Sequence, residues 1–320
     1  MRAAALLATL AVALAPALAS AQAYPNRPIR LVVPFPPAGA TDILSRELAR
    51  HLSDRLKQQV VVDNRPGAGG SIGSDIVAKS APDGYTIQMA TSSTHAIGPH
   101  LNPKIPYNAL TDFTPIAHVA DSANVLVVAP NVKAASVSEL IALLKAQPGG
   151  YNFGSSGNGT IVHLTGELFK SMTGTYIVHI PYRGTALVIP DMIGGQIHIL
   201  FDNVASALPY LKDGKLRALA VTSLQPSPLL PGVPTVAETV PGFDSTTWFG
   251  IFGPKGLSPE VVQRLNTEVN AVLKNPEFRE RLKTLGYEAA GGTPADFARV
   301  VANDSAKWAR LIKERGITGE

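Results

Sequence analysis

The chain has 320 residues, of which 16% are charged and 6% aromatic, and its formal net charge is +4 at pH 7. It contains no cysteine, which excludes disulfides, thiolate metal sites and cysteine nucleophiles. The mild positive charge suits small anionic ligands. Because lysine and arginine are neither clustered nor interleaved with aromatic residues, nucleic-acid binding is not predicted.

Residues 1–23 differ from the rest of the chain. Arg2 is their only charge, residues 3–19 are almost wholly apolar, and small-x-small sites end at Ala21 and Ala23. This pattern is typical of a secretory signal peptide, so we expect export to the periplasm with cleavage near Ala21 or Ala23. An uncleaved membrane anchor is the alternative, but the apolar run is short for a membrane span.

From residue 29 onward, strands, glycine-rich turns and helices alternate. Residues 29–33 form an apolar, β-branched run typical of a strand buried on both faces. Thr41 is a candidate N-cap, and leucines then recur every fourth residue, at Leu44, Leu48, Leu52 and Leu56. Further strands are expected at 60–62, 85–90, 125–129, 151–153, 177–180, 197–201, 216–221 and 248–252. Further helices are expected up to about 79 and at 137–146, 260–273, 276–285 and 295–315.

Alternating units of this length predict an α/β fold with parallel-rich sheets and a helical C-terminal tail. The pattern restarts after Asn124, which suggests two lobes with the chain crossing near 124–129 and 242–250. We expect one lobe from 24–124 plus 246–320, and another from 125–245. The proline-dense stretch 226–241 is expected to be a long surface connection.

Three glycine-rich stretches, 34–41, 66–71 and 154–160, each follow a strand and precede a helix. In open α/β sheets, ligands bind beyond the carboxyl ends of strands, where helix N-termini present unpaired N–H groups. The loop at 154–160 could hold a nucleophile, cradle a phosphate or bind another anion.

The enzyme interpretations of these loops lack required residues. A nucleophile elbow needs glycine where Asn158 stands, and a P-loop needs a lysine before Thr160. A dinucleotide fingerprint needs glycine at the position of Ile72. The histidines show no metal-ligand spacing. We therefore expect no catalysis, no cofactor and no metal.

A carboxylate-binding site requires fewer specific residues than these enzyme motifs. Backbone N–H groups and short hydroxyls can hold an anion, and each charge-assisted hydrogen bond contributes roughly 1.5–3 kcal/mol. Ser155, Ser156 and Thr160 supply hydroxyls, and neighbouring glycines such as Gly157 let the backbone approach closely. The alternative is a helix cap that serves only stability. Phe35, in the first loop, is either a ligand wall or packing between lobes.

Three more residues have both a functional and a structural interpretation. Asp202 ends the run at 197–201 and either faces the ligand or caps the next helix. Asp42 either contacts the ligand or stabilises the first turn of its helix through the helix dipole. His163, one turn into its helix, is either a surface residue or a contact to ligand or lobe.

The chain resembles the extracytoplasmic solute-binding proteins of tripartite tricarboxylate transporters, the Bug (TctC-like) family. The resemblance spans the mature chain. Its motifs are "Asp-Asn-Arg-Pro-Gly-Ala-Gly-Gly" at 63–70, "Ser-Ser-Gly-Asn-Gly-Thr" with "His-Leu" at 155–164, "Pro-Tyr-Arg-Gly" at 181–184, "Phe-Asp-Asn" at 201–203 and "Val-Pro-Thr-Val-Ala-Glu" at 233–238. Departures from the family pattern are Ala40 in place of a second glycine, a late proline in 184–191, and His198 in place of an aspartate.

The resemblance implies a two-lobed periplasmic-binding-protein fold of type II, the Venus flytrap, that closes over a small carboxylate. Its expected ligand-binding residues are Phe35, Pro37, Ala38, Gly39, Thr41, Asp42, Ala68, Gly70, Ser92, Ser155, Ser156, Gly157, Thr160, His163 and Asp202. We expect a monomeric receptor that delivers a mono- or dicarboxylate to membrane permease subunits. The alternatives are a sensing component that signals to a sensor kinase, and a secreted hydrolase using Ser156 and His163.

Overall fold

The computed structural model describes residues 24–102 and 104–318. The expected signal peptide and its cleavage site lie outside these residues. Within them, no helix is both long and apolar enough to cross a membrane.

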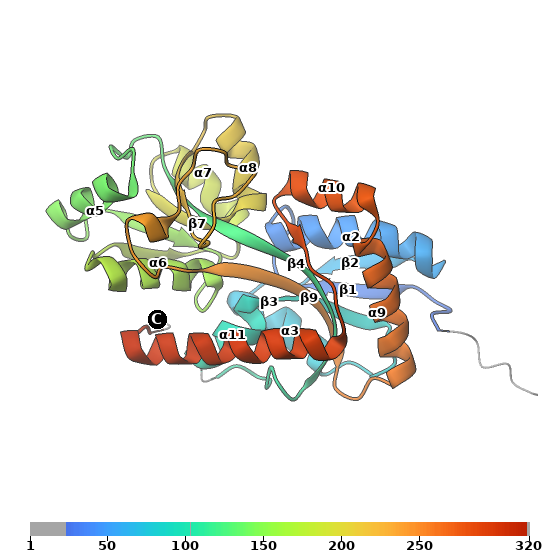
Figure 1. Cartoon of the computed structure of the whole chain (residues 1–320). Helices are drawn as coiled ribbons and strands as arrows, with labels where there is room; N and C mark the ends of the chain where they lie inside the picture. Colours follow the sequence, from blue (N-terminus) through green and yellow to red (C-terminus); the bar gives the residue numbers. More distant parts are fainter. Residues whose placement is uncertain (1–23, 103, 319–320) are drawn as a thin grey trace, which may run out of the picture.

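The first half of the molecule is a mixed sheet flanked by helices (Figure 1). Its strands are β1 (Ile29–Val33), β2 (Val60–Asn64), β3 (Thr86–Thr91), β9 (Thr246–Pro254), β10 (Glu288–Ala289) and the beginning of β4 (Phe113–Val128). Its helices are α2 (Ala40–Leu56), α3 (Ser71–Ala78), α4 (Gly98–Leu101), α9 (Pro259–Leu273) and α10 (Pro276–Leu285), with short turns η1 (Ala68–Gly70) and η2 (Ser93–Ile97). Strand β1 is buried and pairs in parallel with both β2 and β3.

The second half repeats the arrangement around the end of β4. Its strands are β5 (Asn152–Ser155), β6 (Val178–Pro181), β7 (Ile199–Asn203) and β8 (Arg217–Val221). Its helices are α5 (Val137–Ala146), α6 (Ile161–Thr173), α7 (Val188–Ile193) and α8 (Val204–Lys212), with short turns η3 (Thr185–Leu187) and η4 (Val236–Glu238). The parallel pairs β5–β6 and β5–β7 agree with the predicted pattern.

Strand β4 joins the two halves and corrects one prediction. It runs without interruption through 113–128, whereas the sequence pattern predicted a strand only from 125. Its first part pairs with β9 as far as Ala123, opposite Thr246, and its last part pairs with β7 from Asn124 onward. Pro115 and several polar residues interrupt the apolar strand pattern in the first part of β4, so no strand was predicted there. The pairing register with β9 also shifts in this part. Every pair made by β4 or β9 is antiparallel, so the sheet is mixed.

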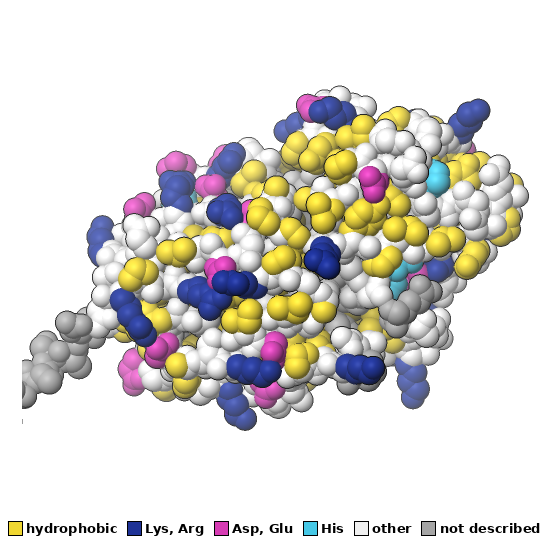
Figure 2. Space-filling model, turned by 180° about the vertical axis from the view of Figure 1, so that it is seen from behind, with side chains coloured by type: hydrophobic (Ala, Val, Ile, Leu, Met, Phe, Trp, Pro, Cys, Tyr) yellow, Lys and Arg dark blue, Asp and Glu magenta, His cyan; other side chains and the backbone are white. Residues whose placement is uncertain are grey.

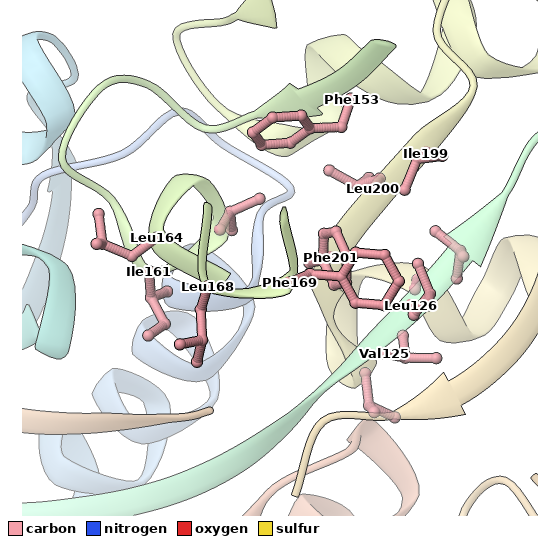
Figure 3. Packing of buried hydrophobic residues seen from close by; sticks show 14 of the residues in the cluster. Val125, Leu126, Phe153, Ile161, Leu164, Leu168, Phe169, Ile199, Leu200 and Phe201 are labelled. Atoms are coloured by element: carbon pink, nitrogen blue, oxygen red, sulfur yellow. The ribbon is translucent and has the colours of Figure 1, made fainter. Parts of the chain in front are cut away.

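The core of the second half forms where α6 packs on the sheet (Figure 3). Phe153 of β5, Phe169 of α6 and Phe201 of β7 are fully buried there, beside Val125 and Leu126 of β4. Burial of each such side chain contributes about 1.5–3 kcal/mol. The predicted surface connection at 226–241 is only partly exposed, because Val236 within it is buried in the same core.

Helix α11 (Pro294–Arg315) runs along the underside of both halves (Figure 1). It begins with a capping box between Thr293 and Asp296. The Trp248 indole N–H on β9 donates to the Asp304 carboxylate at 2.8 Å, and Lys307 pairs with Asp244 at 2.9 Å. The helical tail therefore braces the region where the chain passes between the halves.

On the face shown in Figure 2, lysine and arginine side chains lie singly or beside acidic ones. Among the described residues on this face, they form no continuous basic surface of the kind that binds nucleic acid.

Candidate functional site

The strand ends and helix starts of the two halves meet around a narrow cavity of about 30 Å³. Four residues predicted to bind ligand line it: Phe35, Gly39, Thr41 and Ser156. An adjoining cavity of about 420 Å³ shares Phe35, Ser93 and Ser156 with it. The predicted residues Ala68, Gly70 and Gly157 line this second cavity. The structure thus brings together all three glycine-rich loops.

Three helix starts at the narrow cavity lack side-chain caps. The N-cap residues Gly39 of α2, Gly184 of η3 and Asn203 of α8 line the cavity and make no side-chain cap hydrogen bond. Helix α6 also begins at the cavity, where Ile161 and Val162 line it, but its N-cap Thr160 accepts a hydrogen bond from the His163 N–H. Away from the cavity, α5, α9, α10 and α11 carry such caps at Ser136, Ser258, Asn275 and Thr293. Uncapped first-turn N–H groups and the positive end of the helix dipole favour an anion at this point.

This arrangement corrects the predicted cap of α2. Gly39, with an extended backbone, precedes the helix, and Thr41 lies within its first turn. A threonine at the cap would have placed its own hydroxyl over the N–H groups. Glycine leaves them open toward the cavity.

Hydroxyl groups complete the narrow cavity. The buried Thr91 hydroxyl has no hydrogen-bond partner among the described residues, although Thr91 lines the cavity. Thr185 and Thr247 line it as well. The Ser93 hydroxyl accepts a hydrogen bond from the Ile161 N–H at the start of α6, at 2.9 Å, and so connects the two halves.

Asp42 positions the first loop through hydrogen bonds. Its carboxylate accepts from the Ala38 N–H at 3.0 Å, from the Asn64 amide at 2.9 Å and from Arg46 at 2.9 Å. Burial alone would raise the pKa of Asp42, but these hydrogen bonds outweigh it and lower the pKa. Ala38, which makes this contact, has a φ of 66°. Asp42 is therefore an ionised positioning residue for the loop.

The second loop is braced by buried polar side chains. The Ser155 hydroxyl accepts from the Gly157 N–H at 3.1 Å, and the Thr160 hydroxyl donates to the Gly157 carbonyl at 2.7 Å. Nδ1 of His163 accepts from the Gly159 N–H at 3.2 Å. Burial lowers the pKa of His163 to about 3, so a neutral imidazole holds the loop at physiological pH.

The same contacts argue against the hydrolase alternative. The serine–histidine contact in this loop joins Ser155 and His179, whose Oγ and Nε2 lie 2.6 Å apart, rather than Ser156 and His163. Ser155 is fully buried, and Nδ1 of His179 has no partner among the described residues. An activated serine needs access to substrate and a base that is oriented by a third group. Nor do the described residues contain a metal-binding group of three or more His, Cys, Asp or Glu side chains.

Asp202 lies buried behind the narrow cavity. It accepts from the Ser206 hydroxyl at 2.6 Å and from the N–H of Asn203, which lines the cavity, at 2.9 Å. Burial raises the pKa of Asp202 to about 6, although hydrogen bonds from Ser206, Asn203 and Thr185 act in the opposite direction. Asn203, rather than Asp202, is the N-cap residue of α8.

The remaining predicted residues lie beside the cavities. Pro37 and Ala38 are exposed on the first loop, and Ser92 is fully buried with a hydroxyl that has no partner among the described residues. The residues in neither lining are Pro37, Ala38, Asp42, Ser92, Ser155, Thr160, His163 and Asp202. Direct ligand contact by them stays a prediction.

Sequence reasoning missed several lining residues, among them Thr91, Ser93, Gly184, Thr185, Asn203 and Thr247. Gly184 and Asn203 had a signal, because each belongs to a family motif at the end of a strand, β6 and β7 respectively. Thr91 and Thr247 sit near the ends of strands without glycine-rich sequence around them.

Comparison with known proteins identifies the family. The profile of TctC, described as the tripartite tricarboxylate transporter family receptor, matches residues 44–317. The chain belongs to this family. It is 42% identical over 299 residues to Protein BugT of Bordetella pertussis, covering 93% of this chain and 92% of that one.

Solved structures of similar proteins include the periplasmic binding protein BugD, with a TM-score of 0.89, 34% identity and coverage of 93% of this chain and 100% of that one. Rpa4515 of R. palustris, solved with adipate, gives a TM-score of 0.90 with 38% identity, over 92% of this chain and 99% of that one. MatC of Rhodopseudomonas palustris, with bound malate, gives 0.87 with 28% identity, over 90% and 100% of the two chains. This TctC-family receptor has the periplasmic-binding-protein fold.

Proposed function

We propose that this protein is a periplasmic receptor that captures a small organic carboxylate between two lobes and delivers it to the permease subunits of a tripartite tricarboxylate transporter. The observation that carries the proposal is the pair of uncapped helix starts at Gly39 and Asn203, which face a cavity also lined by the unpartnered Thr91 hydroxyl. Backbone N–H groups and a hydroxyl together suit a carboxylate. The receptor makes and breaks no covalent bond.

The proposed lobes are 24–124 plus 246–320, and 125–245. The change of partner along β4 supports this division, because β4 pairs with β9 as far as Ala123 and with β7 from Asn124. Closure of such lobes over a ligand would stabilise the bound state through contacts to both.

The similar structures support the ligand class. Rpa4515 was solved with adipate and MatC with malate, and both ligands are carboxylates. We extend to this chain the periplasmic location, a cleaved signal peptide and a monomeric state.

A thermal-shift screen of the chain from residue 24 onward tests the proposal. The panel would contain small carboxylates, with amides or esters of the same acids as controls. A ligand at about 100 times its Kd should add roughly 2.7 kcal/mol to the free energy of unfolding. Stabilisation by some carboxylates but not by their amides supports the proposal. Equal shifts with acids and amides, or none for the folded ligand-free protein, contradict it.

A further inference from the structure

The cavity that adjoins the anion site is much larger than one carboxylate needs. Its volume is about 420 Å³, against about 30 Å³ for the narrow cavity, and the two meet at Phe35, Ser93 and Ser156. A ligand held by its carboxylate at the helix starts would therefore have room to extend past Phe35.

The charges around the larger cavity are all of one sign. Lys104 and Arg183 line it, and no aspartate or glutamate is among its lining residues in the described part of the chain. Neither cation makes an ion pair with any described residue, and both side chains are exposed. An anion placed beside both would be attracted by two positive charges.

The two cations come from opposite halves of the molecule. Lys104 follows α4 in the first half, and Arg183 follows β6 in the second. Close-packed glycine loops from both halves line the same cavity: a Cβ built on Gly69 would lie 2.5 Å from the Asn158 carbonyl oxygen. The ring of Tyr182 is fixed because its hydroxyl donates to Asp191 at 2.5 Å.

The rest of the lining suits an uncharged ligand body. Phe35, Leu101, Ile105 and Tyr107 line the cavity and offer apolar surface. A chain of methylene groups could lie along these side chains, with its far end between the two cations.

We infer that this receptor selects an elongated dicarboxylate, with one carboxylate at the uncapped helix starts and the other beside Lys104 and Arg183. The inference rests on the proposed function and deepens it. The distal carboxylate contacts both halves, so it also favours the closed arrangement.

Binding calorimetry with matched ligands tests this inference. For straight-chain dicarboxylates of increasing length, each diacid is compared with its monomethyl ester, which keeps the length and removes the distal charge. We expect affinity to rise with chain length up to an optimum, where the diacid binds at least tenfold more tightly than its half-ester.

Variants then locate the distal group. Arg183→Gln and Lys104→Gln should each weaken diacid binding about fivefold, as expected for a partly exposed charge pair, and leave half-ester binding unchanged. Lys145→Gln is the matched control, since Lys145 is exposed on α5 and lines neither cavity.

The outcomes distinguish a failure of the dicarboxylate inference from a failure of the proposed function. Equal binding of diacids and half-esters by the unmodified protein would overturn the dicarboxylate inference and leave the proposed function intact. An equal loss of diacid and half-ester affinity in Arg183→Gln would also overturn it, because a general electrostatic effect would then explain the loss. If no carboxylate of any length binds the folded protein, the proposed function itself fails.

Discussion

Buried polar residues behind and within the narrow cavity are kept at a cost to stability. A buried hydroxyl without a partner costs about 1–3 kcal/mol, and Thr91 carries such a hydroxyl among the described residues. Asp202 is a buried carboxyl whose pKa is raised to about 6. An apolar side chain at Thr91 or an amide at Asp202 would be buried at a lower free-energy cost. Such costly residues are expected where ligand binding, and not stability, determines the residue type.

Replacing Thr91 by the isosteric valine separates stability from binding. Thr91→Val should leave the free energy of unfolding unchanged or raise it by about 1 kcal/mol, and weaken carboxylate binding about tenfold. Thr165→Val is the control, because that buried hydroxyl donates to the Ile161 carbonyl at 2.7 Å and lies outside both cavities. Denaturant unfolding and calorimetry measure the two effects, and unchanged affinity in Thr91→Val would rule out a hydroxyl–ligand contact.

Asp202→Asn should change how stability depends on pH. The folded pKa of Asp202 is about 6, against an ordinary value of 3.8, so between these values the folded state binds more protons than the unfolded state. The contribution of Asp202 to stability therefore falls as pH rises from about 4 to 6 and is constant above. The total is up to about 3 kcal/mol.

Urea unfolding of both proteins between pH 4 and 7 checks this. The buried histidines act in the opposite direction, because they stay neutral in the folded state, but they are common to both proteins and cancel in the difference. The advantage of Asp202→Asn should grow as pH rises through the window. A pH-independent difference would show that Asp202 titrates normally.

At the scale of elements, α2 begins without a side-chain cap. The missing cap lowers the stability of the helix but leaves its first N–H groups available to an anion. Gly39 has extended backbone angles that serine adopts without strain, and the nearest atom to an added Cβ is the Pro36 carbonyl oxygen at 3.7 Å. A serine there could cap the helix itself.

Gly39→Ser should raise the free energy of unfolding by a few tenths of a kcal/mol and weaken carboxylate binding several-fold, because the new hydroxyl competes for the same N–H groups. The reverse change at a helix remote from the cavity, Ser136→Gly in α5, is the control. It should cost a few tenths of a kcal/mol with no effect on affinity. Tighter binding in Gly39→Ser would contradict the role of the bare N-terminus.

Elements with a strong local pattern were predictable from the sequence, and those that depend on distant partners were not. The predicted bounds 29–33, 137–146 and 276–285 agree with β1, α5 and α10. The first part of β4 was missed because it is stabilised by pairing with β9, far along the chain. The glycine-rich loops were identified for the same local reason, whereas Thr91 and Thr247 reach the cavity only through the β3–β9 and β9–β4 pairings.

At the scale of the whole molecule, glycines bring the two halves into close contact. A Cβ on Gly69 would lie 2.5 Å from the Asn158 carbonyl oxygen, and one on Gly184 would lie 2.7 Å from Pro36. Any side chain at these positions would hold the halves apart.

Gly69→Ala should therefore oppose closure. Its φ of 65° strains alanine, so the control is Gly214→Ala, which has a φ of 67° and no atom within 4 Å of the added Cβ. Both variants should lose a similar free energy of unfolding, about 1 kcal/mol. Only Gly69→Ala should bind carboxylate at least tenfold more weakly and lose ligand-induced compaction in small-angle scattering. Equal affinities would mean that the contact does not limit closure.

The bracing of the crossing strands by α11 gives the protein a built-in optical signal. The chain has two tryptophans, and Trp248 on β9 donates its indole N–H to Asp304 of α11, the helix that also carries Trp308. Twisting of β9 against α11 as the lobes move would alter that hydrogen bond and the emission of Trp248. In Trp308→Phe, which isolates this indole, saturating carboxylate should shift the emission maximum. An unchanged spectrum would place the bending elsewhere along the crossing strands.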